Sequence, residues 1–136
     1  MNPYNILVVD DEDFMCKLCG RVLNGMGYEV VFAQNVSEAL GKTGSLERLD
    51  LLITDLRLPD GHGLDVIRAA RAKFPAVGVL VITALLSPET FQAEFQSLGV
   101  SENDMLSKPF AVSGFEAAVK AKLEQVKDPP ERGESK

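Results

Sequence analysis

Five polar side chains stand at the ends of short apolar segments of this 136-residue chain. In an open parallel sheet all strands end at the same edge, and ligands bind in the crevice outside those carboxyl ends. The five residues are therefore expected to meet in one place, although they lie far apart in the sequence. They carry three carboxylates, a hydroxyl and an ammonium group: Asp10, Asp11, Asp55, Thr83 and Lys108.

Carboxylates that crowd together repel one another, so such a cluster is costly unless a hard divalent cation neutralises it. Combined with a lysine and a hydroxyl, the cluster is typical of a phosphoryl site that depends on Mg²⁺. Asp55 is the predicted phosphoryl acceptor, because a carboxylate after a buried strand is held by the sheet yet accessible at its edge. The alternative is that Asp55 only caps the turn that precedes Pro59-Asp60-Gly61.

The other candidates also have simpler explanations. Asp10 and Asp11 could be N-caps of the first helix. Lys108 could be a solvated surface lysine, and Thr83 could be a β-branched residue that merely ends a strand.

The elements that must position these residues alternate between strand and helix signals, which predicts repeated βα units. Three of the strand segments are continuously apolar, as expected of central strands that helices cover on both faces. We expect a flavodoxin-like three-layer sandwich whose parallel five-stranded sheet has the order 2-1-3-4-5. The expected strands lie near 5–10, 28–33, 50–54, 78–83 and 104–107, and the helices near 13–26, 36–47, 64–73, 88–98 and 112–126.

Composition limits the other functions. The length fits one domain, expected over residues 1–126, and the polar, proline-interrupted residues 127–136 are expected to be a disordered tail or the start of a linker. A formal net charge of −6 argues against direct nucleic-acid binding, which needs clustered lysine and arginine. The N-terminus has no basic and apolar leader pattern, and no run approaches a membrane-spanning length, so a cytoplasmic location away from membranes is expected.

Three local motifs invite other functions and are set aside. Cys16 and Cys19 form a Cys-x-x-Cys pair, but a structural zinc site needs four ligands and the single histidine, His62, lies far away, so core packing is expected. Gly41-Lys42-Thr43 imitates part of a P-loop within a predicted helix, without the first glycine. His62, between two glycines, is interpreted as a turn residue.

Four segments, in this order, resemble the receiver domain of response regulators, the phosphoacceptor half of two-component signalling. They are residues 7–12, 55–61, 81–84 and 108–110, and the resemblance spans residues 4–126. It implies a regulatory protein, not an enzyme, with self-catalysed phosphoryl transfer and slow autodephosphorylation only. The implied donor is a sensor histidine kinase or a histidine phosphotransfer protein, and the implied receiver of the signal is an output domain or effector protein.

The resemblance also implies roles at the site. Asp11 would bind Mg²⁺ directly, Asp10 largely through water, Asp55 through another oxygen, and Arg57 through its backbone carbonyl. Mg²⁺ prefers octahedral oxygen coordination and keeps several waters, so these ligands suffice.

Two further residues take family roles. Lys108 would pair first with Asp55 and then with a phosphoryl oxygen, and the family's Lys-Pro bond, here Lys108-Pro109, is cis. Thr83 would donate its hydroxyl to the phosphate.

Two departures from the family pattern fall on its usual signalling face. Receivers usually carry tyrosine or phenylalanine three residues before the lysine, where this chain has Met105. The loop between Gly99 and Lys108 is expected to be two residues longer than is common in the family.

Two other functional classes compete with a signalling receiver. An aspartate-based phosphohydrolase usually needs a second aspartate two residues after the nucleophile, where this chain has Arg57. A pseudo-receiver, which binds partners without phosphorylation, is the main alternative because of Met105 and the altered loop.

Overall fold

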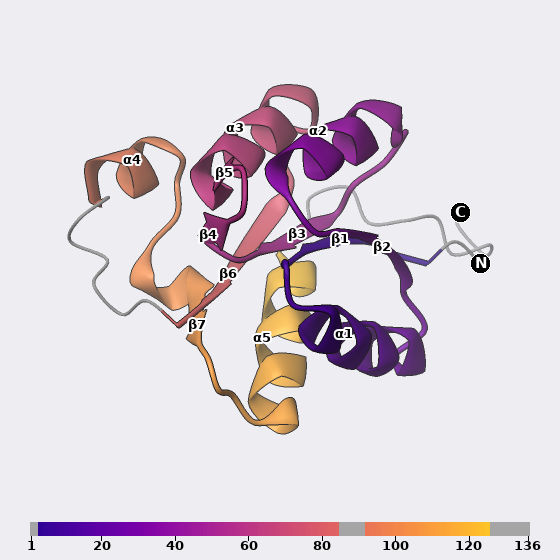
Figure 1. Cartoon of the computed structure of the whole chain (residues 1–136). Coiled ribbons are helices and arrows are strands. Elements are labelled where there is room, and N and C mark those ends of the chain that lie inside the picture. Colours follow the sequence, from indigo (N-terminus) through magenta and orange to yellow (C-terminus); the bar gives the residue numbers. More distant parts are fainter. Residues whose placement is uncertain (1–2, 85–91, 126–136) are drawn as a thin grey trace.

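A five-stranded parallel sheet forms the centre of the molecule, in a computed structural model that describes residues 3–84 and 92–125. The strand order is β2-β1-β3-β6-β7 (Figure 1), which is the predicted order 2-1-3-4-5 when only the strands of this sheet are numbered. The flavodoxin-like prediction is therefore confirmed. The strands are β1 (Asn5–Val9), β2 (Glu29–Ala33), β3 (Leu51–Thr54), β6 (Gly78–Thr83) and β7 (Met105–Ser107).

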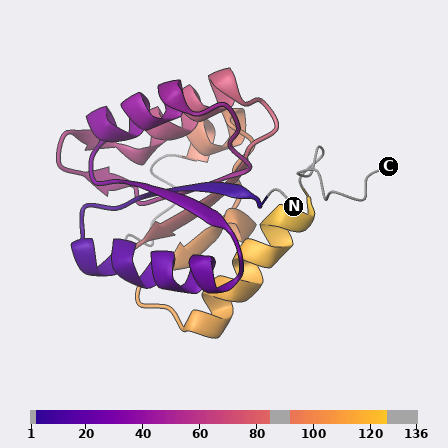
Figure 2. The ribbon, with the colours of Figure 1, turned by 90° about the vertical axis from the view of Figure 1, so that its right-hand side faces the viewer.

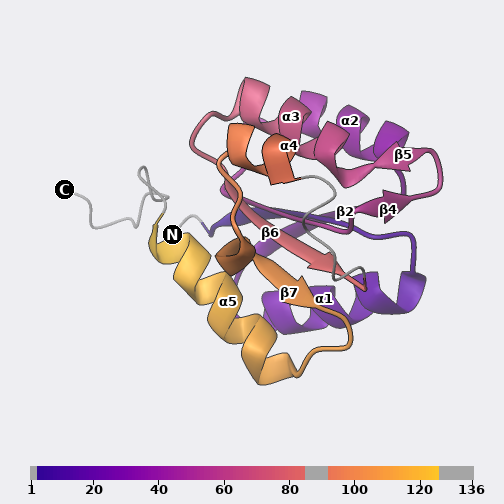
Figure 3. The same cartoon turned by 90° about the vertical axis from the view of Figure 1, so that its left-hand side faces the viewer.

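Helices cover both faces of the sheet and make three layers. α1 (Asp13–Gly25) and α5 (Val112–Glu124) lie on one face, as Figure 2 shows. α2 (Val36–Ser45), α3 (Gly63–Lys73) and α4 (Gln92–Ser97) lie on the other face (Figure 3). The predicted start of the fourth helix near residue 88 and the predicted tail 127–136 lie outside the described residues.

Two hydrophobic cores lie on the two sides of the sheet because side chains alternate along each strand. Leu7 and Val9 of β1 contribute to the core under α2, α3 and α4, whereas Ile6 and Val8 contribute to the core under α1 and α5. The central strands β1, β3 and β6 are almost wholly buried, and the edge strands β2 and β7 are only partly buried. This division agrees with the apolar runs in the sequence.

The sequence interpretation missed a small antiparallel hairpin after β3. It consists of β4 (Arg57–Leu58) and β5 (Gly61–His62), and it leads directly into α3. A 3-10 turn, η2 (Glu102–Asp104), lies between α4 and β7, in the loop that was expected to be two residues longer than is common in the family. This segment thus forms a defined turn before β7.

Candidate functional site

The backbone ladder of the sheet continues past the last strand residues and sets the positions of the site. The amide of Asp10 donates to the carbonyl of Ala33 at 3.1 Å, and the amide of Asp55 donates to the carbonyl of Val9 at 2.9 Å. At the other side of the sheet the amide of Lys108 donates to the carbonyl of Thr83 at 2.9 Å. Each residue is therefore held by a neighbouring strand, which fixes where its side chain leaves the sheet.

Three carboxylates gather at this edge. One carboxylate oxygen from each of Asp10, Asp11 and Asp55 lies within 4.8 Å of the other two. Asp10 and Asp55 are buried, with 0% and 7% exposure, while Asp11 is exposed. Asp55 is more enclosed than its position at a strand end suggested. The three oxygens are hard ligands, so the chemistry of this donor set fits a Mg²⁺ ion.

Lys108 lies between the two buried carboxylates. Its Nζ is 2.8 Å from Oδ2 of Asp55 and 2.7 Å from Oδ2 of Asp10. Glu12 is a third and more distant neighbour, with Oε1 3.6 Å from the same Nζ. The Lys108-Pro109 bond is cis, as the resemblance implied. The pair with Asp55 was expected, but the equally short pair with Asp10 was not.

Burial and ion pairing shift the pKa values of Asp10 and Lys108 in opposite directions. Burial raises the pKa of Asp10, and the hydrogen bonds and charge of Lys108 only partly offset that shift. For Lys108, burial alone would lower the pKa, yet Asp10 and Asp55 together raise it above the usual lysine value. Lys108 is therefore a fixed positive charge at neutral pH, and the carboxylates around it still exceed it in number.

Backbone amides donate hydrogen bonds to the two buried carboxylates. The Oδ1 atom of Asp10 accepts the amide of Glu12 at 2.9 Å, just before α1 begins at Asp13. The Oδ1 atom of Asp55 accepts the amide of Leu56 at 2.7 Å. The alternative that Asp10 or Asp11 is the N-cap of the first helix is wrong, because the N-cap is Glu12 and no side chain caps the helix there. In both Asp10 and Asp55 the other oxygen, Oδ2, pairs with Lys108.

The remaining candidates take two different places. Thr83 is buried, at 3% exposure, at the end of β6 and beside the start of the Lys108 segment. Arg57 is exposed in β4, two residues after Asp55. Arg57 is the first residue of β4, so the position of the hairpin sets where its backbone carbonyl lies.

Gly63 is a positioning residue that the sequence interpretation missed. A Cβ atom at Gly63 would overlap the backbone carbonyl oxygen of Asp55 and crowd Leu56. The amide of Gly63 donates to the carbonyl of Leu56 at 2.8 Å, and the Thr54 hydroxyl donates to the carbonyl of Asp55 at 2.8 Å. The start of α3 therefore packs directly against the backbone of Asp55, which only glycine allows.

The hairpin after Asp55 is anchored to another helix. The carboxylate of Asp60, between the two hairpin strands, accepts the amides of Val36 at 2.7 Å and Ser37 at 2.9 Å. These are the first two residues of α2, whose unpaired amides favour an acidic partner. The same hydrogen bonds lower the pKa of Asp60. No local pattern paired Asp60 with residues 23 and 24 positions away.

The motifs that were set aside have structural roles. Cys16 and Cys19 are buried free thiols, and burial raises their pKa to about 11 and about 12. The Sγ atom of Cys16 donates to the carbonyl of Asp10 at 3.3 Å. His62 is the N-cap of α3 and accepts the amide of Leu64 through Nδ1 at 3.1 Å. The predictions of core packing for the cysteines and of turn chemistry for the histidine are confirmed.

Among the residues that the structure describes, none of the helices has the length and apolar character needed to cross a membrane.

The family model of the response regulator receiver domain matches residues 6–120. Because that match covers most of the chain, this protein belongs to the response regulator receiver family. The resemblance seen in the four sequence segments is thereby confirmed.

Curated relatives are similar over most of this chain. The response regulator protein PilR of Pseudomonas aeruginosa is 37% identical over 109 residues, which are 80% of this chain and 24% of PilR. The KDP operon transcriptional regulatory protein KdpE of Escherichia coli is 32% identical over 119 residues, 88% of this chain and 51% of KdpE. The chain thus spans about a quarter to a half of the length of these two relatives.

Solved structures share the fold. A CheY-like response regulator receiver domain protein of Methanospirillum hungatei has a TM-score of 0.81 at 27% identity, over 91% of this chain and 97% of that one. A chemotaxis response regulator of Vibrio cholerae has a TM-score of 0.79 at 28% identity, over 90% of this chain and 100% of that one.

Proposed function

We propose that this receiver domain accepts a phosphoryl group on Asp55 from a phosphohistidine, with Mg²⁺ as cofactor, and signals by a change of conformation. In the transfer an Asp55 carboxylate oxygen forms a bond to phosphorus while the phosphorus–nitrogen bond of the donor breaks, and the electron pair of that bond returns to the imidazole. The observation that carries the proposal is the contact of Lys108 with Asp55 beside two further carboxylates.

The residues of this chain divide the work of the transfer. Lys108 is a compact charge within hydrogen-bond distance of Asp55, so it can follow the negative charge onto a phosphoryl oxygen. Thr83, at the end of the neighbouring strand β6, would donate its hydroxyl to the phosphoryl group.

The metal would be held by Asp11 directly, by Asp10 largely through water, by an oxygen of Asp55 and by the backbone carbonyl of Arg57. When bound, Mg²⁺ supplies the charge that offsets the crowded carboxylates and the transferring phosphoryl group.

Partners are proposed from the family. The donor would be a sensor histidine kinase or a histidine phosphotransfer protein in the cytoplasm. We propose residues 1–126 as the receiver unit, with residues 127–136 as a tail or linker. KdpE is named as a transcriptional regulatory protein, so an output domain or a separate effector would read the phosphorylated state here.

The decisive experiment is phosphorylation by acetyl phosphate or phosphoramidate, with and without Mg²⁺. Intact-mass measurement is expected to find one added phosphoryl group in the wild type, only with Mg²⁺, and none in Asp55→Asn. The bond should be labile to base and to hydroxylamine, as an acyl phosphate is. Equal labelling of both proteins would refute Asp55 as the acceptor, and no labelling under any condition would favour the pseudo-receiver.

A further inference from the structure

A polar cavity lies at the amino ends of the strands, on the opposite side of the sheet from the carboxyl ends where Asp55 lies. It has a volume of about 270 Å³ and is bounded by the start of β6, the end of α3 and the end of α5. β6 runs from Gly78 at the cavity to Thr83 at the phosphoacceptor site, so the two sites lie roughly 17 Å apart at about 3.3 Å per residue. The cavity is therefore separate from the site described above.

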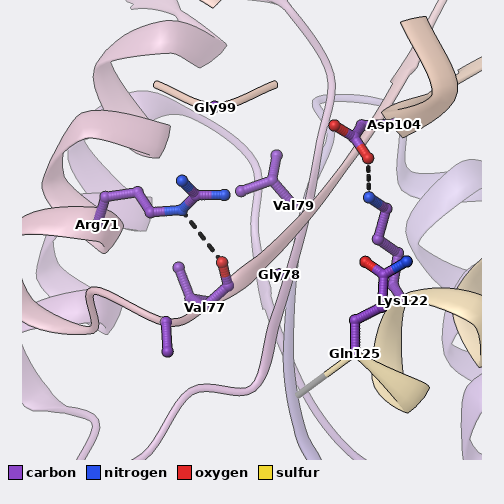
Figure 4. A pocket seen from close by; sticks show the side chains of 9 residues that line it. Arg71, Val77, Gly78, Val79, Gly99, Asp104, Lys122 and Gln125 are labelled. Atoms are coloured by element: carbon purple, nitrogen blue, oxygen red, sulfur yellow. Dashed lines mark hydrogen bonds and ion pairs between the residues drawn. The ribbon is translucent and has the colours of Figure 1, made fainter. Parts of the chain in front are cut away.

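Two cations face this cavity. Arg71 of α3 enters from one side and Lys122 of α5 from the other, with β6 between them and Gly99 beside the Arg71 guanidinium (Figure 4). Among the residues that the structure describes, the only carboxylate lining the cavity belongs to Asp104, which pairs with Lys122. The charged lining is thus two cations and one anion, in a chain whose formal net charge is −6.

Arg71 has no acidic partner among residues 3–84 and 92–125. Its guanidinium donates from Nε to the carbonyl of Val77 at 3.1 Å and from a terminal nitrogen to the carbonyl of Leu98. A guanidinium has five N–H donors, so neutral carbonyls use only part of its capacity. Within the described part of the chain, the partly buried charge of Arg71 therefore has no counterion.

The two cations also disfavour one another. Burial lowers the pKa of Arg71. Burial and, after it, the charge of Arg71 lower the pKa of Lys122, although Lys122 contacts the Asp104 carboxylate. An anion between them would relieve this repulsion and use the remaining N–H donors. The side-chain amide of Gln125, at the same rim, could add a neutral donor.

We propose that this cavity binds a small oxyanion of the phosphate class, held by Arg71 and Lys122. The ligand would connect the end of α3 to the end of α5. A side chain at Gly99 would meet a terminal nitrogen of the Arg71 guanidinium at 3.4 Å, so glycine there leaves that nitrogen uncovered. Because the cavity has charged and polar walls, an apolar ligand of similar size is disfavoured.

The test is a titration of the full chain with inorganic phosphate in buffer without Mg²⁺. Amide chemical shifts are recorded at each phosphate concentration. Sodium chloride of matched ionic strength is the control. Saturable shifts are expected at Val77, Gly78 and Gly99 with phosphate and not with chloride. Absence of saturable shifts, equal shifts with chloride, or shifts confined to the amides of Asp10 and Lys108 would overturn the proposal.

Two variants that break the same ion pair sharpen the test. Lys122→Gln removes a charged donor and should weaken phosphate binding by about tenfold, the loss of one charge-assisted hydrogen bond. Asp104→Asn removes the carboxylate that repels the ligand and frees Lys122, so phosphate should bind more tightly than in the wild type. A purely structural role of the ion pair would change both variants in the same direction, which would contradict an oxyanion site.

Discussion

At Gly63 the absence of one carbon atom lets the start of α3 lie against the carbonyl oxygen of Asp55. In Gly63→Ala the added methyl group must displace that backbone, so we expect a loss of about 1–3 kcal/mol of unfolding free energy, as for other overpacked sites. We also expect slower phosphorylation of Asp55, because its carboxylate moves with its backbone. Urea unfolding and intact-mass labelling measure the two effects.

Gly41→Ala is the matched control for this substitution. Gly41 lies inside α2, and a Cβ atom there meets nothing within 4 Å. Alanine in a helix interior should raise stability by roughly 0.5–1 kcal/mol and leave labelling unchanged. If Gly63→Ala matched Gly41→Ala in both measurements, the contact of Gly63 with Asp55 would affect neither stability nor phosphorylation, and the prediction would be wrong.

A second prediction at this scale concerns Asp11, the exposed member of the carboxylate cluster. Mg²⁺ should raise the thermal midpoint of the wild type, since a ligand at a hundredfold excess over Kd adds about 2.7 kcal/mol. Asp11→Asn should melt at a higher temperature than the wild type without metal, because one repelling charge is gone, and should respond less to Mg²⁺. Thermal melts with millimolar Mg²⁺ and with chelator compare the two proteins. An equal Mg²⁺ response in both would remove Asp11 from the metal site.

At the scale of elements, the first turn of α3 depends on a histidine that titrates. His62 caps the helix by accepting the amide of Leu64. Burial lowers the pKa of His62 below the ordinary value of 6.5; the charge of Arg68 also lowers it, whereas Asp65 and Asp55 raise it by less than burial lowers it. The unfolded chain therefore binds a proton at a higher pH than the folded chain does. Stability should fall as the pH decreases from 6.5 toward the folded pKa, and protonation of Nδ1 would also remove the cap.

His62→Asn provides the comparison for this titration. Asparagine is a good N-cap and does not titrate, so the variant should lack this part of the pH dependence. Urea unfolding at pH 7.5 and pH 5.5 would measure it, and His62 is the chain's single histidine, which simplifies the assignment. Identical pH profiles for wild type and variant would show that the cap does not depend on the ionisation of His62.

At the scale of the whole molecule, the proposed signal from the phosphoacceptor site would have to pass through β7. Met105 starts this strand, pairs in register with Val81 of β6, and packs partly buried against the core under α3 and α4. A thioether chain has three rotatable bonds and no hydroxyl, so it specifies one position weakly. We expect Thr83 to respond to a phosphate mimic while the surface of α4 and β7 changes less than in an aromatic-bearing receiver.

Amide chemical shifts with and without beryllofluoride test this expectation. Met105→Phe should give larger and more uniform shifts over β7, if the ring fits the space that Met105 occupies. A ligand can bias only those states that it binds differently, so a response limited to Thr83 would leave the distal face near its resting population. Large two-state shifts across β7 in the wild type, unchanged in Met105→Phe, would show that methionine supports a full switch.

The sequence by itself determined the class of fold and the edge at which the chemistry is expected. Continuous apolar runs predicted central strands, and the parallel sheet they imply places Asp10, Asp55 and Lys108 at one edge. These inferences succeed because strand burial and strand direction follow from local patterns of apolar residues. The receiver resemblance depended on the same strand-end residues.

Only the tertiary structure decided which atoms meet. No local pattern indicated three of these contacts: the ion pair of Lys108 with Asp10, the contact of Gly63 with the Asp55 carbonyl, and the hydrogen bonds of Asp60 to the start of α2. The cavity between Arg71 and Lys122 was not indicated either. Each depends on the distance between segments that different strands and helices carry. Such distances are set by how the layers pack, and neither hydrophobic periodicity nor residue type encodes them.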